Sequence, residues 1–325
     1  MALPLLNTPI RPLTVIAAVM TAAIVLLPSC EKLADGVVNE IEFPEHEPRL
    51  AVTMFVTPGD TVLLATVYQS AGIMDLAGST PLRQSTVTLT QNGEVLAFGD
   101  STNWGETPWE PGYAQNVMKM TLENPLVLAP GEISLAVDAS PTFEPIVITE
   151  TMPDVPVVDH LFEPFADTVV TQWEDYEFYN HRITVNLDNR PGARDDYMIF
   201  LEAKGAFEGH SWYSTGSGAF PDPRMEYSSG CSCLLATDNG EDNVSMDNLV
   251  FEVYAGDNGG YAQEQFLRLR VERPTSSLSN YFRSVDAYNN ALGNPFAEPA
   301  SIQGNIPDGF GIFGVTSEVV VPLWE

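Results

Sequence analysis

Basic residues are scarce in this sequence. Only 14 Lys and Arg stand against 44 Asp and Glu, which gives the 325-residue chain a formal net charge of -30. Nucleic-acid phosphates are repelled by such a surface, and no basic stripe is present to overcome the repulsion. The same deficit argues against docking on anionic lipids through charge. The composition therefore argues against nucleic acid as a partner.

Histidine is also scarce, and familiar signatures of catalysis are missing. The four histidines are scattered along the chain, at His46, His160, His181 and His210. No His-Glu-x-x-His or Gly-x-Ser-x-Gly motif occurs. His160 and His181 fall in expected strands and are interpreted as structural residues. Adjacent acids such as Asp195 and Asp196 point to opposite faces of a strand, so we interpret them as solvated surface rather than glycosidase carboxylates. We therefore expect a protein that is not an enzyme.

An apolar run over residues 13–27 is the most prominent feature of the N-terminal part. Its length is that of a signal-peptide hydrophobic region, and it is short for a transmembrane helix, which needs about 20 residues. The run ends in Leu27-Pro-Ser-Cys30, which resembles the lipobox of bacterial lipoproteins, although proline is unusual at its place. We predict that residues 1–29 are a lipoprotein signal peptide and that Cys30 carries lipid; the alternative is an ordinary secretory signal.

Residues 30–48 are predicted to be a lipidated tether, because they are charged and show no sustained hydrophobic period. Several acyl chains on one cysteine give stable anchoring to a membrane. Glu31 and Asp35 follow the cysteine closely, which resembles the surface-export signal of Bacteroidetes lipoproteins. We therefore expect a protein lipid-anchored in the outer membrane at the cell surface, with the periplasmic face as the alternative.

Residues 49–150 read as a set of short strands. Segments such as 50–56 and 61–68 are rich in alternating apolar residues, and the dipeptides Pro58-Gly59 and Asn92-Gly93 supply hairpin turns. Hydrophobic residues make up 44% of the chain, so packed cores are attainable. About seven strands in roughly 100 residues predict an Ig-like or transthyretin-like β-sandwich.

Residues 151–156 contain two prolines and are predicted to be a stiff linker. Strands resume in residues 157–325, the last of them expected over 315–323. One segment changes period, and its apolar spacing predicts an amphipathic helix near 276–292. The predicted fold class is therefore all-β, with two β-sandwich-like domains and one amphipathic helix near the C-terminus.

Two cysteines remain besides Cys30, at Cys231 and Cys233. In an oxidising compartment they can form a disulfide, although a bond across one residue closes a small, strained ring that is easily reduced. The alternatives are free thiols and a soft-metal or redox site. Two thiols without further ligands do not complete a zinc set.

Calcium is the strongest cofactor candidate that the sequence offers. Hard oxygen ligands gather in one loop, at Asp238, Glu241, Asp242 and Asp247. Their spacing does not match an EF-hand, and a polar turn is the plainer interpretation. No other cofactor is expected.

The C-terminal segment is similar to a known family. The expected helix, the run 294–299 and the glycine-rich run 304–314 resemble a Bacteroidetes outer-membrane lipoprotein family known as domain of unknown function 4249. The lipobox, the Pro130-Gly131 turn and the linker agree with it in order, so the resemblance covers nearly the whole mature chain. Residues 205–247 fit no pattern of that family.

The resemblance implies a function but no catalytic residues. Members are outer-membrane lipoproteins commonly encoded beside TonB-dependent transporters. It therefore implies a non-catalytic accessory to such a transporter in nutrient capture. The alternative is a stand-alone surface module that binds glycan or protein. Aromatic residues outside the strands, such as Trp109, are interpreted either as hydrophobic plugs or as a binding platform for such a module.

The glycine-rich run is interpreted as structural from its residues. Gly309, Gly311 and Gly314 permit positive φ angles or close approach of the backbone. The apolar residues between them, Phe310, Ile312 and Phe313, are expected to be mostly structural and packed against a core, with at most some of them exposed for a partner.

Overall fold

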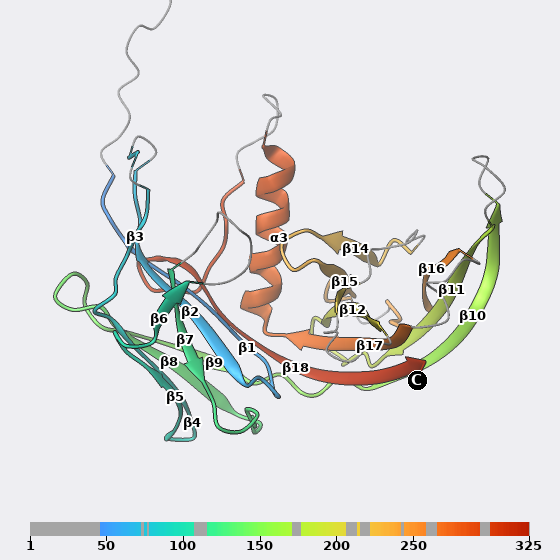
Figure 1. Cartoon of the computed structure of the whole chain (residues 1–325), viewed down its shortest axis with the longest axis horizontal. Coiled ribbons are helices and arrows are strands. Elements are labelled where there is room, and N and C mark those ends of the chain that lie inside the picture. Colours follow the sequence, from blue (N-terminus) through green and yellow to red (C-terminus); the bar gives the residue numbers. More distant parts are fainter. Residues whose placement is uncertain are drawn as a thin grey trace, which may run out of the picture. The chain divides into compact units, whose positions relative to one another are not determined.

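Strands dominate the computed structural model of this protein. It describes residues 46–324 apart from 73, 74, 77, 107–115, 171–176, 206–212, 215–221, 242–243, 258–264 and 293–299. From residue 47 onward these belong to one compact unit. The described residues form three sheets and a single helix, which confirms the predicted all-β class with one helix near the C-terminus (Figure 1). The predicted signal peptide, Cys30 and most of the tether lie outside the described residues.

The largest sheet has eleven strands. Its main path runs β14-β15-β12-β17-β18-β1-β2-β7-β6, with β13 paired to β12 and β3 paired to β2. The bounds of these strands are β1 (Leu50–Val56), β2 (Val62–Gln69), β3 (Thr80–Pro81), β6 (Trp104–Glu106), β7 (Asn116–Thr121), β12 (Asp196–Gly205), β13 (Tyr213–Ser214), β14 (Met225–Ser228), β15 (Cys233–Thr237), β17 (Gln265–Pro274) and β18 (Phe310–Trp324).

Two smaller antiparallel sheets complete the strand structure, in the orders β5-β4-β8-β9 and β10-β11-β16. The first consists of β4 (Thr86–Gln91), β5 (Glu94–Gly99), β8 (Glu132–Asp138) and β9 (Ile146–Thr151), and the second of β10 (Val158–Val170), β11 (Glu177–Leu187) and β16 (Leu249–Asp257). The predicted Asn-Gly hairpin joins β4 to β5, where Asn92 and Gly93 both have positive φ, 52° and 80°.

Each small sheet packs on the large one through a hydrophobic core of its own. In the first core, Val52 and Met54 of β1 meet residues of the four-stranded sheet such as Leu135. In the second, Ile199 of β12 meets residues of the three-stranded sheet such as Phe251. The architecture is therefore two β-sandwiches that share one sheet.

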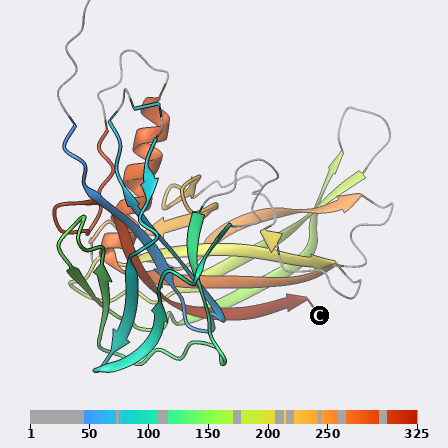
Figure 2. The ribbon, with the colours of Figure 1, turned by 60° about the vertical axis from the view of Figure 1, so that its left-hand side comes forward.

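The last described strand, β18, contributes to both cores. Phe313 and Val315 belong to the first core, and Val319 and Val321 pack against the second. These residues alternate along the strand, so they lie on one face of the sheet. β18 pairs in parallel with β1 and antiparallel with β17, beside which it runs in Figure 2. It thereby carries the sheet from one sandwich to the other.

Helix α3 (Ser276–Ala291) packs on the opposite face of the large sheet. Its buried Leu278 and Phe282 form a third core with residues that include Ile312 of β18. Phe55 of β1 stacks on Phe282 with ring centroids 5.7 Å apart. The apolar spacing in the sequence therefore located this helix correctly. The expected buried face is only partly right, because Tyr288 and Leu292, which the same spacing includes, are exposed.

The glycine-rich run lies in a tight crossing of β18 with β1 and α3. The strand begins at Phe310, five residues earlier than predicted, because these glycines extend the parallel pairing with β1. At Gly311, where φ is 97°, a Cβ atom would overlap the carbonyl oxygen of Val52. At Gly314 it would lie 2.6 Å from a methyl group of Leu278. Both positions need glycine for close approach of the backbone.

The segment predicted as a linker connects β9 to β10. Its backbone is tied to the chain before it at Met152, whose amide donates to the carbonyl of Gly131 at 2.8 Å. The domain boundaries at 49–150 and 157–325 stay a prediction. The structure adds that strands from both sides of the segment belong to the eleven-stranded sheet.

Candidate functional site

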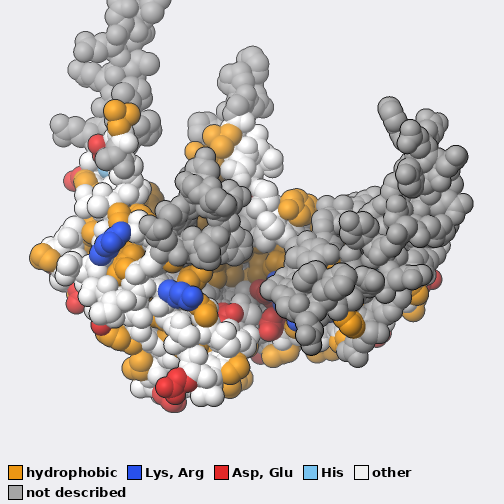
Figure 3. Space-filling model, viewed as in Figure 1, with side chains coloured by type: hydrophobic (Ala, Val, Ile, Leu, Met, Phe, Trp, Pro, Cys, Tyr) orange, Lys and Arg blue, Asp and Glu red, His pale blue; other side chains and the backbone are white. Residues whose placement is uncertain are grey.

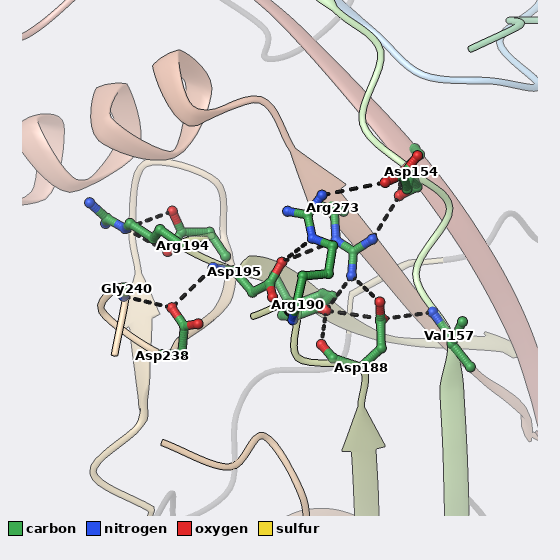
Figure 4. A network of polar contacts seen from close by, with 12 residues as sticks. Asp154, Val157, Asp188, Arg190, Arg194, Asp195, Asp238, Gly240 and Arg273 are labelled. Carbon is green, nitrogen blue, oxygen red and sulfur yellow. Dashed lines mark hydrogen bonds and ion pairs between the residues drawn. The ribbon is translucent and has the colours of Figure 1, made fainter. Parts of the chain in front are cut away.

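Arg273, near the end of β17, is the centre of a buried polar network (Figure 4). Its side chain is 2% exposed. One Nη donates to the carboxylate of Asp188 at 2.6 Å and to the hydroxyl of Tyr197, and the other donates to the backbone oxygen of Asp154 at 3.1 Å. A guanidinium is the side chain best suited to this role, because its planar fork can reach several acceptors at once.

A second layer of the network surrounds Asp195, which is fully buried. Its carboxylate accepts from Nε of Arg190 at 2.7 Å and lies 3.8 Å from Nε of Arg273. Its amide donates to the carboxylate of Asp238 at 3.0 Å. Asp196, 6% exposed, pairs with Arg194 and Arg283. Our interpretation of Asp195 and Asp196 as solvated surface was therefore wrong. Each of the two carboxylates lies beside two arginines, and this pairing offsets the free-energy cost of burying a charge.

The network shifts the ionisation of its members. Burial alone would raise the pKa of Asp188, but the hydrogen bond from Arg273 and the Val157 amide outweigh it and hold that pKa below its usual range. Burial would likewise lower the pKa of Arg273, yet its bonds to Asp188 and Tyr197 raise it. Burial raises the pKa of Tyr197. The carboxylate and the guanidinium are thus both held charged.

The network also fixes the connecting segment in place. The backbone oxygen of Asp154 accepts from Arg273 and, at 2.7 Å, from the hydroxyl of Ser317 on β18. The amide of Val157 donates to Asp188 at 2.9 Å. A segment expected to act as a spacer is therefore part of the packed structure.

A pocket of about 440 Å³ opens between this segment and the start of α3. It is lined by residues 149–154, 190, 194, 196 and 273–277. Three arginines and three carboxylates lie among them, together with several hydroxyl groups. The volume falls in the range of about 300–1,000 Å³ that is usual for small-ligand sites.

The start of α3, which is the positive end of its helix dipole, lies at this pocket beside the carboxylate of Glu150. Glu150 accepts a hydrogen bond from the Ser277 hydroxyl at 2.6 Å and another from the side-chain amide of Asn305 at 2.5 Å. A carboxylate at a helix N-terminus interacts favourably with the helix dipole. Glu150 therefore already compensates the positive end of the α3 dipole.

The predicted cysteine pair lies beside α3, away from the pocket lining. A disulfide joins Cys231 and Cys233, whose Cα atoms are 5.2 Å apart. The turn before it is tied to the helix by Asp286, which accepts from the amide of Ser229 at 3.0 Å and from that of Gly230 at 3.2 Å. The contacts give this loop a structural role.

Two of the predicted calcium ligands, Asp238 and Asp247, are hydrogen-bonded to protein groups. Asp238 is buried and accepts from the amides of Asp195 and Gly240. Asp247 accepts from the hydroxyl of Ser245 at 2.7 Å. Asp242 lies outside the described residues, and the described part of the chain gathers no three side chains of metal-binding type. Calcium binding at Asp238, Glu241, Asp242 and Asp247 stays a prediction.

Of the two histidines expected in strands, His181 is the buried one. It is 3% exposed, and its ring lies 5.2 Å from that of Phe162, centroid to centroid. Burial lowers its pKa from 6.5 to about 4. His181 is therefore neutral in the folded protein above about pH 4.

We expect acid to destabilise the fold through His181. Between about pH 6.5 and pH 4 the unfolded chain binds a proton at this histidine that the folded chain does not, so the free energy of unfolding falls by up to about 3 kcal/mol. Urea unfolding of the wild-type protein and of His181→Gln at several pH values would measure this. The difference between the two proteins should change across that window; a constant difference would contradict the prediction.

The comparisons with known proteins leave the family open. The sequence matches no protein-family model. It also matches none of the curated proteins. No helix within the described ranges is long and apolar enough to cross a membrane.

On the face shown in Figure 3, the described Lys and Arg side chains form separated patches among uncharged and hydrophobic groups.

The sequence reasoning missed the arginines of the pocket. Arg190 and Arg194 lie four residues apart in a chain with only 14 basic residues, and Asp195 and Asp196 follow directly. This clustering of rare cations with acids was the available signal. Arg273 is distant in sequence, so only the pairing of β12 with β17 brings it to the site.

Proposed function

We propose that this protein is a lipid-anchored component of the bacterial outer membrane that captures a nutrient, without catalysis, as an accessory to a TonB-dependent transporter. The observation that carries the proposal is the polar pocket beside α3. Its charged groups are largely engaged with one another, which favours recognition of a ligand over acid–base chemistry.

Two features of the sequence support the membrane part of the proposal. The apolar run 13–27 ends at Cys30 in a lipobox-like motif, and the acidic residues that follow fit export to the surface. The order of motifs in the mature chain resembles that of a lipoprotein family encoded beside such transporters. Lipid on Cys30 would keep the pocket close to the membrane.

The test is affinity purification of the full chain from native outer membranes, with Cys30→Ser as the matched control. We expect a transporter to co-purify with the wild-type protein and to be lost from the variant. Mass spectrometry of the N-terminal peptide should find lipid on Cys30, and a free amine at any other mature N-terminus would overturn the anchor. Lipid without a transporter would favour the stand-alone surface module, since the pocket is built by one chain.

A further inference from the structure

We propose that the pocket beside α3 binds a neutral mono- or disaccharide, held by Asp154, Arg190 and Arg194. The inference rests on the proposed capture role and names the class of ligand for the same pocket. It is argued from the charge balance of the lining and from the hydrogen-bonding groups that are accessible there.

The charged groups that line the pocket disfavour a strongly ionic ligand. Its three arginines are matched by three carboxylates, Glu150, Asp154 and Asp196. Arg190 is paired with buried Asp195 at 2.7 Å, Arg194 with Asp196 at 3.0 Å, and Arg273 with Asp188 at 2.6 Å. Each arginine that an anion would meet is therefore already paired. A cation would compete with Arg190 for Asp154 and with Ser277 and Asn305 for Glu150, so the loss of water by either ion would be poorly offset.

The accessible groups of the pocket are both donors and acceptors. The side chains of Arg190 and Arg194 are 38% and 37% exposed, and among the described residues nothing bonds to Nη2 of either. The side chain of Asp154 is 74% exposed, and its contact with a described residue is a long one, 3.5 Å to Arg190. Ser276, at the start of α3, adds an exposed hydroxyl.

A sugar matches this arrangement. Each of its hydroxyls donates and accepts, and neighbouring hydroxyls suit the two oxygens of a carboxylate or the two nitrogens of a guanidinium. The guanidinium groups of Arg190 and Arg194 are held by Asp195 and Asp196, so these two side chains lose little freedom on binding. A pocket of about 440 Å³ has room for one or two sugar units.

Calorimetric titration of the full-length protein, in a detergent without a sugar headgroup, tests the proposal. The probes are a panel of neutral mono- and disaccharides, with inorganic phosphate, spermidine and glycine as anionic, cationic and zwitterionic probes. We expect a sugar of the panel to bind with a Kd that hardly changes with salt, since screening acts on charge pairs. Absence of binding by every sugar at millimolar concentration, or binding of another probe instead, would overturn the proposal.

Two variants separate the ligand classes by the direction of their effect. For a neutral sugar, Asp154→Asn and Arg194→Gln should both weaken binding, each by about tenfold, the loss of one charge-assisted hydrogen bond. An anion would lose affinity in Arg194→Gln but gain it in Asp154→Asn, and a cation would do the reverse. Lys119→Gln, which removes an exposed positive charge on β7, is the matched control and should leave binding unchanged. Thermal melting would verify that the variants are folded.

This test is independent of the transporter. Sugar binding without a co-purifying transporter would sustain the ligand assignment and refute the accessory role. A transporter that co-purifies with a protein unable to bind any sugar would do the opposite.

Discussion

Replacing Arg273 by methionine is expected to lower the free energy of unfolding by about 3–5 kcal/mol. Methionine fills similar space but leaves the buried carboxylate of Asp195 and the paired Asp188 without their shared cation. It also releases the backbone oxygen of Asp154, so the connecting segment loses one of its ties. Urea unfolding at neutral pH measures the loss.

The control for this experiment is Arg49→Met. Arg49 is exposed, and its guanidinium lies 5.9 Å from the ring of Phe310, so its loss should cost less than about 1 kcal/mol. Arg273→Lys keeps the charge but not the fork of donors, and we expect a loss between those of the other two variants. Equal losses in Arg273→Met and Arg49→Met would refute the central role of the network.

Truncating Phe313 to alanine should lower the free energy of unfolding by about 3–5 kcal/mol. The ring is fully buried in the first core, opposite Met54 of β1. Its backbone is fixed on both sides by Asn305, at 2.8 Å for each bond, so the strand cannot easily move to fill the cavity. Denaturant unfolding measures the effect.

Phe310 is the matched control, because it is the same residue type on the same strand. It is 48% exposed, and alternation along β18 places it on the opposite face from Phe313. Phe310→Ala should therefore cost less than about 1 kcal/mol. If Phe313→Ala left stability unchanged but abolished co-purification of a transporter, this strand would be an interface and the structural interpretation would fail.

Local signals in the sequence were sufficient for much of the fold. The hairpin at Asn92-Gly93 follows from the φ angles that these residues tolerate, and α3 follows from the spacing of Leu278 and Phe282. Both depend on interactions between near neighbours, which a short window of sequence contains. The glycines of the 304–314 run were likewise expected at places of close approach, and Gly311 and Gly314 lie at such places.

Long-range pairing could not be read from the sequence. The residues that follow Phe310 do not indicate that this strand pairs in parallel with β1. The pairing depends on a partner strand near the other end of the chain. For the same reason the segment 151–156 was expected to be a spacer. Its two prolines do indicate stiffness, but the groups that hold it, Arg273 and Ser317, come from distant strands.

The placement of β18 has a consequence for how the chain is made. This strand is synthesised after every other described strand, yet it completes two cores, and the hydroxyls of Thr57 and Thr316 meet across 259 residues of sequence. Closing so long a loop costs entropy before any contact forms, and such topologies fold slowly. A chain that still lacks β18 therefore has neither core complete. A chain truncated before Phe310 would expose apolar surface on both sandwiches at once and become a ready target for proteases.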